Sequence, residues 1–300
     1  MTPHRTRAYI YLLIVAAIWG IAGPVIKFTL GGIDPLPFLT YRLVISATFS
    51  IIFFLIKGVK LPDPKTTAPL VFLYGILAFT IALGTLFVGL EKTTVLDLTL
   101  ITLSGPLLVT IGGILFFKDH ITRQEKIGIS IVLLGSLFTI FSPIIMNHSD
   151  VRLSGNLFIF LFLLADSSAV LLAKRIVQLK VPPLTLINLG FVVGAITIIP
   201  ITGILYGFPN IVNSITSLSI EYHLGVFYMA LLSGTLAYFL SVLGQKSIEV
   251  SEAVLFRYLQ PLFATPLAIF WLGEQITASF IFGAVIIGTG VVIAEYKKRR

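Results

Sequence analysis

The feature that most constrains this 300-residue chain is the recurrence of apolar stretches of about twenty residues. A helix needs roughly 20 apolar residues to cross the ~30 Å hydrocarbon core of a bilayer. The chain contains ten such stretches, separated by mostly short connections. They predict an all-α polytopic membrane protein with ten transmembrane helices: Ala8–Thr29, Leu36–Ile56, Ala68–Gly89, Val95–Phe117, Gln124–Phe141, Gly155–Ile176, Pro183–Gly207, Tyr222–Gly244, Val250–Leu272 and Thr277–Glu295.

The composition excludes most soluble classes. Apolar residues make up 57% of the chain and charged residues 11%, whereas a soluble domain carries about 25% charged residues. The absence of Cys rules out disulfides and thiolate metal sites. Arg5 and Arg7 precede the first apolar run as in a signal peptide, but the run is too long for a signal core, so we expect a retained helix.

The basic residues predict the orientation of the chain. Sixteen of the 21 Lys and Arg residues fall on the side of the N-terminus, three fall on the other side and two lie within spans. Because Lys and Arg concentrate in cytoplasmic loops, both termini are expected in the cytoplasm of a cell with this protein in its plasma membrane. The net charge of +8 does not gather on a soluble face, so no nucleic-acid partner is expected.

An internal repeat appears when the chain is shifted by 155 residues. Between residues 80 and 135, 14 of 56 positions are identical without a gap. The shift aligns Pro106 with Pro261 and Thr80 with Thr235, and it places Asp97 on Glu252. Self-similarity of this kind marks a repeated architecture.

The shift covers five spans, so the two halves must cross the membrane in opposite directions. We therefore predict two inverted five-helix repeats, residues 1–148 and 149–300. Inverted repeats place a binding site near the midplane, where the halves meet and can rock against each other. The repeat favours transport of a small molecule by alternating access.

Two segments carry a family resemblance. Residues 89–138 and 244–293 each have a helix with a mid-membrane Pro, a short acidic turn and a Gly-marked helix, and the N-terminal half contains the sequence WGIAGPVIKF. The pattern resembles the duplicated EamA module of the drug/metabolite transporter superfamily. The resemblance implies a ten-helix exporter or exchanger of small metabolites, often amino acids. The first copy departs from the usual LGE turn, with Lys118 and Asp119 in its place.

Three charged residues inside the spans are candidates for substrate binding, since such residues are costly in lipid. Asp166 would hold a coupling proton or a substrate ammonium; otherwise it bonds to Ser167, Ser168 or a neighbouring helix. Arg257, with Tyr258 and Gln260 beside it, would bind a substrate carboxylate; otherwise it pairs with Glu249 or Glu252. Arg42 would bind a substrate anion or close an outer gate with Asp97; otherwise it forms a structural ion pair. These expectations rest on the depth of each residue in its span.

Gates and helix caps account for a second group of residues. Asp97 and Glu252 occupy equivalent positions near opposite faces, as two gates would, although acids at helix starts are also favoured by the helix dipole. Asp119 and Glu274 are expected to cap the starts of the fifth and tenth helices. Proline at depth can hinge a gate or simply permit packing; the gating candidates are Pro24, Pro106 and Pro261.

Uncharged residues complete the predicted binding set. Trp19, Tyr41, Tyr238 and Tyr258 could stack on a substrate, although Tyr is also common at membrane interfaces. The remaining candidates are hydrogen-bonding residues: Thr80, Asn188 and Thr235.

The predicted function is secondary-active export of a small metabolite such as an amino acid, coupled to protons or to exchange. The sequence holds no GxSxG, HExxH or P-loop motif, so we expect neither an enzyme nor a cofactor, a metal or ATP. The alternatives are an antiporter of phosphorylated or nucleotide-linked metabolites, a lipid-modifying membrane enzyme and a scaffold without transport activity. The antiporter is disfavoured because few cations lie deep in the spans, and the membrane enzyme because the sequence has no carboxylate or His cluster. The scaffold is disfavoured because charged residues do lie deep in the spans.

Overall fold

The computed structural model describes residues 3–58, 62–118, 122–145, 150–245, 253 and 256–295. Within these residues the regular secondary structure is helical throughout, which confirms the predicted all-α class. Nine of the described helices, some of them interrupted, are long and apolar enough to cross a membrane. The remaining predicted span, Val250–Leu272, lies partly outside the described residues.

The elements follow the predicted spans closely. In chain order they are α1 (Pro3–Thr29), α2 (Pro35–Lys57), α3 (Ala68–Gly75), the π-helix η1 (Ile76–Ala82), α4 (Leu83–Lys92), α5 (Val95–Thr102), α6 (Gly105–Phe117), α7 (Arg123–Ile145), α8 (Asp150–Gln178), α9 (Pro183–Tyr206), α10 (Phe208–Thr216), α11 (Ile220–Phe227), the π-helix η2 (Tyr228–Leu236), α12 (Ala237–Gln245), the 3₁₀-helix η3 (Phe256–Leu259), α14 (Gln260–Phe270) and α15 (Ala278–Glu295).

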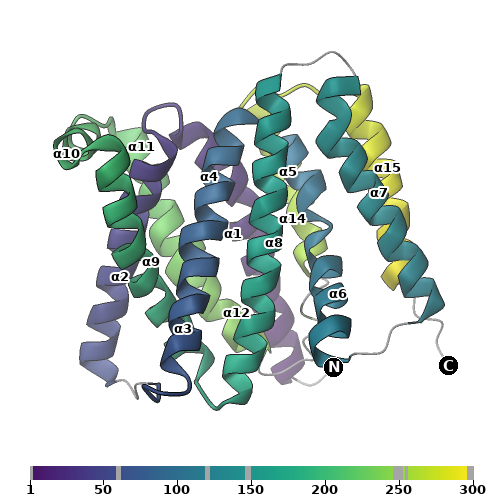
Figure 1. Cartoon of the computed structure of the whole chain (residues 1–300). Coiled ribbons are helices and arrows are strands. Elements are labelled where there is room, and N and C mark those ends of the chain that lie inside the picture. Colours follow the sequence, from purple (N-terminus) through teal and green to yellow (C-terminus); the bar gives the residue numbers. More distant parts are fainter. Residues whose placement is uncertain are drawn as a thin grey trace.

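The helices stand side by side in one bundle (Figure 1). The start of α1 and the end of α15 lie at the same end of this bundle, as an even number of crossings requires. We call this the terminal end and the opposite one the far end. The short helix α10, which the sequence presented only as part of a connection, lies at the far end (Figure 1).

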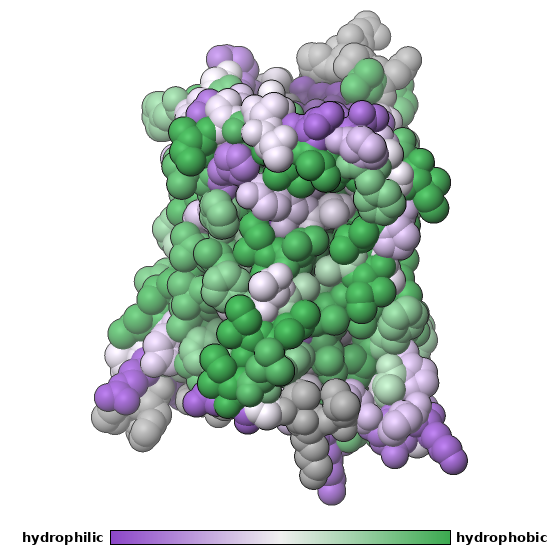
Figure 2. All heavy atoms as spheres, turned by 90° about the vertical axis from the view of Figure 1, so that its left-hand side faces the viewer, coloured by the Kyte–Doolittle hydropathy of each residue, from purple (hydrophilic) through white to green (hydrophobic). Residues whose placement is uncertain are grey.

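The outer surface suits a lipid environment. Figure 2 shows a band of apolar residues across the middle of one face, with polar residues gathered toward the two ends. Within the described chain, Leu55, Ile204 and Phe270 are 80%, 84% and 88% exposed. Large apolar side chains exposed in such numbers are expected where the solvent is hydrocarbon, because lipid tails are as apolar as these side chains.

Four of the spans are interrupted, and the interruptions are related by the repeat. The third and eighth spans contain the π-helical segments η1 and η2. The fourth span breaks between α5 and α6, and the ninth changes from η3 to α14. In the fourth and ninth spans the break is followed by proline in the first turn of the next helix, where its missing N–H costs nothing. Turns of π-helix are rare and often occur at functional sites.

The fifth and tenth spans, α7 and α15, pack closely against each other. A Cβ atom added to Gly128 would lie 2.4 Å from the backbone nitrogen of Ala294, so only glycine permits this approach. The start of α7 is closed by a capping box. Thr122 accepts from the Glu125 amide at 3.2 Å, and its own amide donates to the Glu125 carboxylate at 2.6 Å.

Candidate functional site

A cavity of about 190 Å³ lies among α1, α2, α5, α8, α12 and the start of α14, so both halves of the chain contribute to it. Its apolar lining is rich in aliphatic side chains, and its polar groups are few, as is typical of ligand sites. Nine residues singled out from the sequence line it: Trp19, Arg42, Pro106, Asp166, Tyr238, Arg257, Tyr258, Gln260 and Pro261.

Asp166 and Arg257 form an ion pair across the cavity. Their Oδ2 and Nη1 atoms are 3.6 Å apart, and both side chains are about one-third exposed, at 29% and 35%. Ser168, one of the partners expected for Asp166, instead donates to the Leu164 carbonyl at 2.7 Å. The pairing of Arg257 with Glu249 or Glu252 falls outside the described residues, as does the gating role of Glu252. The 3.6 Å separation is long for a charge-assisted hydrogen bond, so either group can turn to another ligand.

Arg42 differs from Arg257 because no described residue forms an ion pair with it. It is 2% exposed, and its Nε and Nη1 atoms are buried without a hydrogen-bond partner in the part of the chain that the structure describes. Its Cζ lies 5.8 Å from the centroid of the buried Phe87 ring. The expected gate between Arg42 and Asp97 is absent, because Asp97 pairs with another arginine.

An aromatic wall forms one side of the cavity. Trp19 and Tyr238 meet edge to face with their centroids 5.3 Å apart. The Trp19 indole donates to the Ser233 carbonyl at 3.0 Å, which fixes the ring against the π-helix η2. Arg257 lies over the same indole, with its Cζ 6.0 Å from the centroid. This wall offers an apolar, polarisable surface beside the charged pair.

The two proline-marked helix breaks open onto the cavity. Gly105 and Pro106 at the start of α6 line it, as do Gln260 and Pro261 at the start of α14. The positive ends of two helix dipoles therefore lie at the cavity wall. Pro24 is different, since it lies buried inside α1 and does not line the cavity.

Four predicted binding residues lie elsewhere. The Tyr41 hydroxyl is 3.1 Å from Nδ1 of His223. The hydroxyl of Thr80 bonds to that of Thr197 on α9. Asn188 accepts from Ser50 at 2.8 Å, and Thr235 donates to the carbonyl of Ala230 at 3.3 Å; both residues line a separate, mainly apolar pocket. Their polar groups are engaged in helix packing, and none of the four residues lines the cavity.

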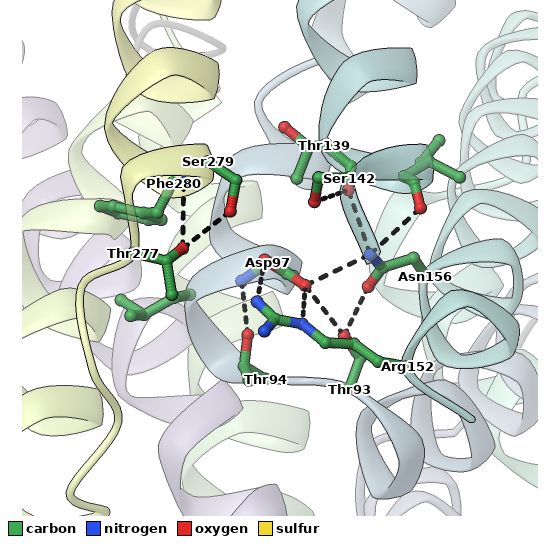
Figure 3. A network of polar contacts seen from close by, with 12 residues as sticks. Thr93, Thr94, Asp97, Thr139, Ser142, Arg152, Asn156, Thr277, Ser279 and Phe280 are labelled. Carbon is green, nitrogen blue, oxygen red and sulfur yellow. Dashed lines mark hydrogen bonds and ion pairs between the residues drawn. The ribbon is translucent and has the colours of Figure 1, made fainter. Parts of the chain in front are cut away.

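A polar network at the far end was missed from the sequence (Figure 3). Arg152 donates from Nε and Nη2 to the two oxygens of Asp97, at 2.7 and 2.9 Å. Asn156 donates to the same carboxylate at 3.2 Å, and Thr93 bonds to both residues. Arg152 and Asn156 are more than 50 positions from Asp97 and Thr93, and Arg152 was expected only as one of the three basic residues on the side opposite the N-terminus. Only the acidic charge of Asp97, near the start of an apolar span, could have signalled that a cation was needed.

Two further charged residues, Lys27 and Glu274, form hydrogen bonds with backbone groups at helix ends at the far end. The Lys27 ammonium donates to the carbonyls of Leu90, Glu91 and Thr93 at 2.7–3.0 Å, where α4 ends. The Glu274 carboxylate accepts the amides of Val95 and Leu96 at 2.7 and 2.9 Å, where α5 begins. Each charge complements the local helix dipole.

The role expected for Glu274 is therefore corrected. It caps α5, the first half of the fourth span, and not the tenth helix that follows it in sequence. The turn that redirects it contains Gly273, at φ +69°. Burial raises the pKa of the Glu274 carboxyl, and the two amide hydrogen bonds oppose this only in part. The matching prediction for Asp119 lies outside the described residues.

Comparison with known proteins supplies a family. The EamA-like transporter family matches residues 6–141 and again residues 153–296. A Bacillus subtilis (strain 168) protein named uncharacterized transporter YdfC is 26% identical over 286 residues, covering 95% of this chain and 89% of that protein. A Salmonella typhimurium protein named a probable amino-acid metabolite efflux pump is 24% identical over 289 residues, covering 94% and 92%.

A solved crystal structure supports the fold alone. Its TM-score is 0.65 at 16% identity, and the match covers 97% of this chain and 98% of that one. The predicted class of ten helices in two inverted repeats is the architecture of the matched family. The chain belongs to the EamA-like transporter family.

Proposed function

We propose that the chain is a secondary-active transporter that exports a small metabolite such as an amino acid by alternating access. The observation that carries this proposal is the cavity shared by both halves, where the Asp166–Arg257 pair stands beside an aromatic wall. A zwitterion needs one anion, one cation and an apolar surface within a small volume. The naming of a relative as an amino-acid metabolite efflux pump supports the same class of substrate.

Each cavity residue is assigned the part of the substrate that its chemistry suits. Asp166 takes the substrate amine or a coupling proton, because its ion pair with Arg257 is long enough to exchange partners. Arg42 or Arg257 takes the carboxylate. Trp19 and Tyr238 contact the side chain. Both repeats, residues 1–148 and 149–300, contribute to these contacts, so rocking of one against the other would open the cavity to alternate faces.

The far-end contacts form one gate in this proposal. Asp97 with Arg152 joins α5 to α8, and Lys27 joins α1 to the end of α4. With both termini in the cytoplasm of a plasma-membrane protein, the far end faces outward, and these bonds must break for substrate to leave.

Reconstitution into liposomes tests the proposal. Labelled leucine would be followed under an imposed proton gradient or with unlabelled leucine on the opposite side. Asp166→Asn should lose the dependence of flux on pH, because the amide cannot take up a proton. The matched control is Asp63→Asn, at an exposed carboxylate outside the cavity. Leucine flux with an unchanged pH profile in Asp166→Asn would remove the proposed role of this residue, and absence of flux for a panel of amino acids would contradict the substrate class.

The orientation has its own test. Because the native sequence has no Cys, single cysteines report accessibility without background. Thr66→Cys should react with an impermeant maleimide only after the cells are opened, and Ser217→Cys should react in intact cells. Both positions are exposed. The reverse pattern would invert the proposed topology.

A further inference from the structure

Arg42 is a buried charged residue whose hydrogen-bond donors are not all satisfied by the described residues. A buried charge is normally paired, and a buried polar atom normally has a hydrogen-bond partner. Arg42 is 2% exposed, lines the cavity and has two buried nitrogen atoms without a partner. The nearby Phe87 ring contributes an aromatic face but accepts no conventional hydrogen bond. The guanidinium is therefore held ready for an acceptor that the described chain does not supply.

The charge balance of the described lining indicates the sign of the missing group. It contains two guanidinium groups, Arg42 and Arg257, and one carboxylate, Asp166. Asp166 lies 3.6 Å from Arg257 and so compensates that charge first. The starts of α6 and α14 add the positive ends of two helix dipoles. The described lining thus has a net charge of +1, in a span where uncompensated charge is costly.

We infer that Arg42 is the anchor for a carboxylate on the transported molecule, and that this carboxylate, more than an ammonium group, is what recognition requires. The inference deepens the proposed function and rests on it for the identity of the cavity as the transport site. A carboxylate offers acceptors that match the donors of a guanidinium. A substrate with a carboxylate and an apolar remainder would neutralise Arg42 and place that remainder among the aliphatic and aromatic side chains of the lining.

The first experiment needs no mutation. The thermal unfolding of the purified wild-type protein in detergent is measured with four probes that share the isobutyl group of leucine: leucine, 4-methylpentanoate, leucinamide and 3-methylbutylamine. A ligand that binds only the folded state raises the melting temperature. Leucine and 4-methylpentanoate should both raise it, and the two probes without a carboxylate should not. Stabilisation by leucinamide or 3-methylbutylamine equal to that by leucine would overturn the inference.

Variants then assign the effect to one residue. Arg42→Gln should weaken 4-methylpentanoate binding at least tenfold, and Arg42→Lys should restore part of it. Arg175→Gln, at an exposed arginine of α8 outside the cavity, makes the same change in net charge and should bind as the wild type does. Equal binding by Arg42→Gln and the wild type would overturn the assignment, whatever the fate of the probe series.

A chloride titration separates a carboxylate site from a general anion site. Chloride alone should raise the melting temperature less than 4-methylpentanoate at equal concentration. Equal stabilisation would contradict selection for a carboxylate.

Failure of this inference and failure of the proposed function give different results. Carboxylate binding that depends on Arg42, without flux in liposomes, removes transport and leaves the Arg42 site. Flux of leucinamide equal to that of leucine leaves transport and removes the requirement for a carboxylate.

Discussion

Arg152 and Arg42 are both largely buried, at 18% and 2% exposure, but they differ in almost every contact. Arg152 at the far end makes two short bonds to Asp97, and Asn156 and Thr93 satisfy the remaining acceptors. Arg42 in the cavity has two buried nitrogen atoms for which the described residues offer no partner. The comparison separates two uses of charge in a membrane span. A network in which each group is paired holds helices together, whereas a group without a partner is available to a ligand.

The same contrast applies to the two carboxylates. Asp97 is almost fully buried and accepts bonds from three side chains. Asp166 is 29% exposed and has one long ion pair. Removing a partner from the first network should therefore affect stability, and removing a group from the cavity should affect ligand binding.

The largest expected effect is that of Asp97→Ala. Loss of the carboxylate leaves Arg152 without the acceptor of its two hydrogen bonds and removes one acceptor of Asn156. Breaking a buried pair costs about 3–5 kcal/mol. We expect the variant to unfold at a markedly lower temperature or denaturant concentration, measured by circular dichroism of the protein in detergent. A loss of unfolding free energy under about 1 kcal/mol would show that this pair contributes no more than an exposed salt bridge. The contrast between Arg152 and Arg42 would then not hold.

Glu274→Ala should cost less, about 1–2 kcal/mol, because it leaves two amides at the start of α5 without a cap. The pKa of this carboxyl is raised by burial in the folded state. The stability that comes from this shift is therefore fully present below the unfolded pKa and is lost as pH rises through the folded pKa. The wild type should therefore exceed Glu274→Ala by more at the acidic end of a pH series than at its alkaline end. A gap that widens toward alkaline pH would contradict this sign.

Gly273→Ala and Lys118→Gly test the turns that the repeat relates. Gly273 has φ +69° and Lys118, at the equivalent position, has φ +57°. A side chain in the left-handed region costs about 1 kcal/mol. We expect Gly273→Ala to lose about that amount and Lys118→Gly to gain somewhat less, since glycine also loses more entropy on folding. Urea titration measures both, and the same sign for the two variants would show that their turns are not equivalent.

The smallest expected change in stability is that of Arg42→Met. Replacing a buried, unpaired charge with an apolar side chain of similar length is neutral or stabilising. The melting temperature without ligand should stay level or rise, while stabilisation by 4-methylpentanoate disappears. A loss of stability comparable to that of Asp97→Ala would assign Arg42 a structural role and remove the contrast between the two arginines.

Hydropathy and repetition predicted the all-α class, the spans and the inverted halves, because bilayer thickness fixes helix length and an odd number of crossings reverses direction. Depth along a helix also selected nine residues that line the cavity. Which residues meet in the cavity also depends on the rotation of each helix about its axis. The depth of a residue in its span does not give that rotation. Thr80 and Asn188 have the right depth, but they face α9 and α2, where Thr197 and Ser50 occupy their polar groups.

The contacts that depend on distant chain segments could not be found in this way. Glu274 was expected to cap the helix that follows it, but the positive φ of Gly273 turns the chain toward α5. Arg152 reaches Asp97 over 55 positions. Neither contact leaves a spacing pattern, because each depends on how whole helices pack.

The tight packing of α7 on α15 provides a fixed reference for distance measurements. Gly128 allows the two helices to approach at backbone distance, and the described residues of neither helix line the cavity. Spin labels at the exposed positions Ser130 and Thr289 should therefore keep one separation whatever the rest of the bundle does. Changes in the distance from the α7–α15 pair to α1 or α8 would then report displacement of α1 or α8 alone.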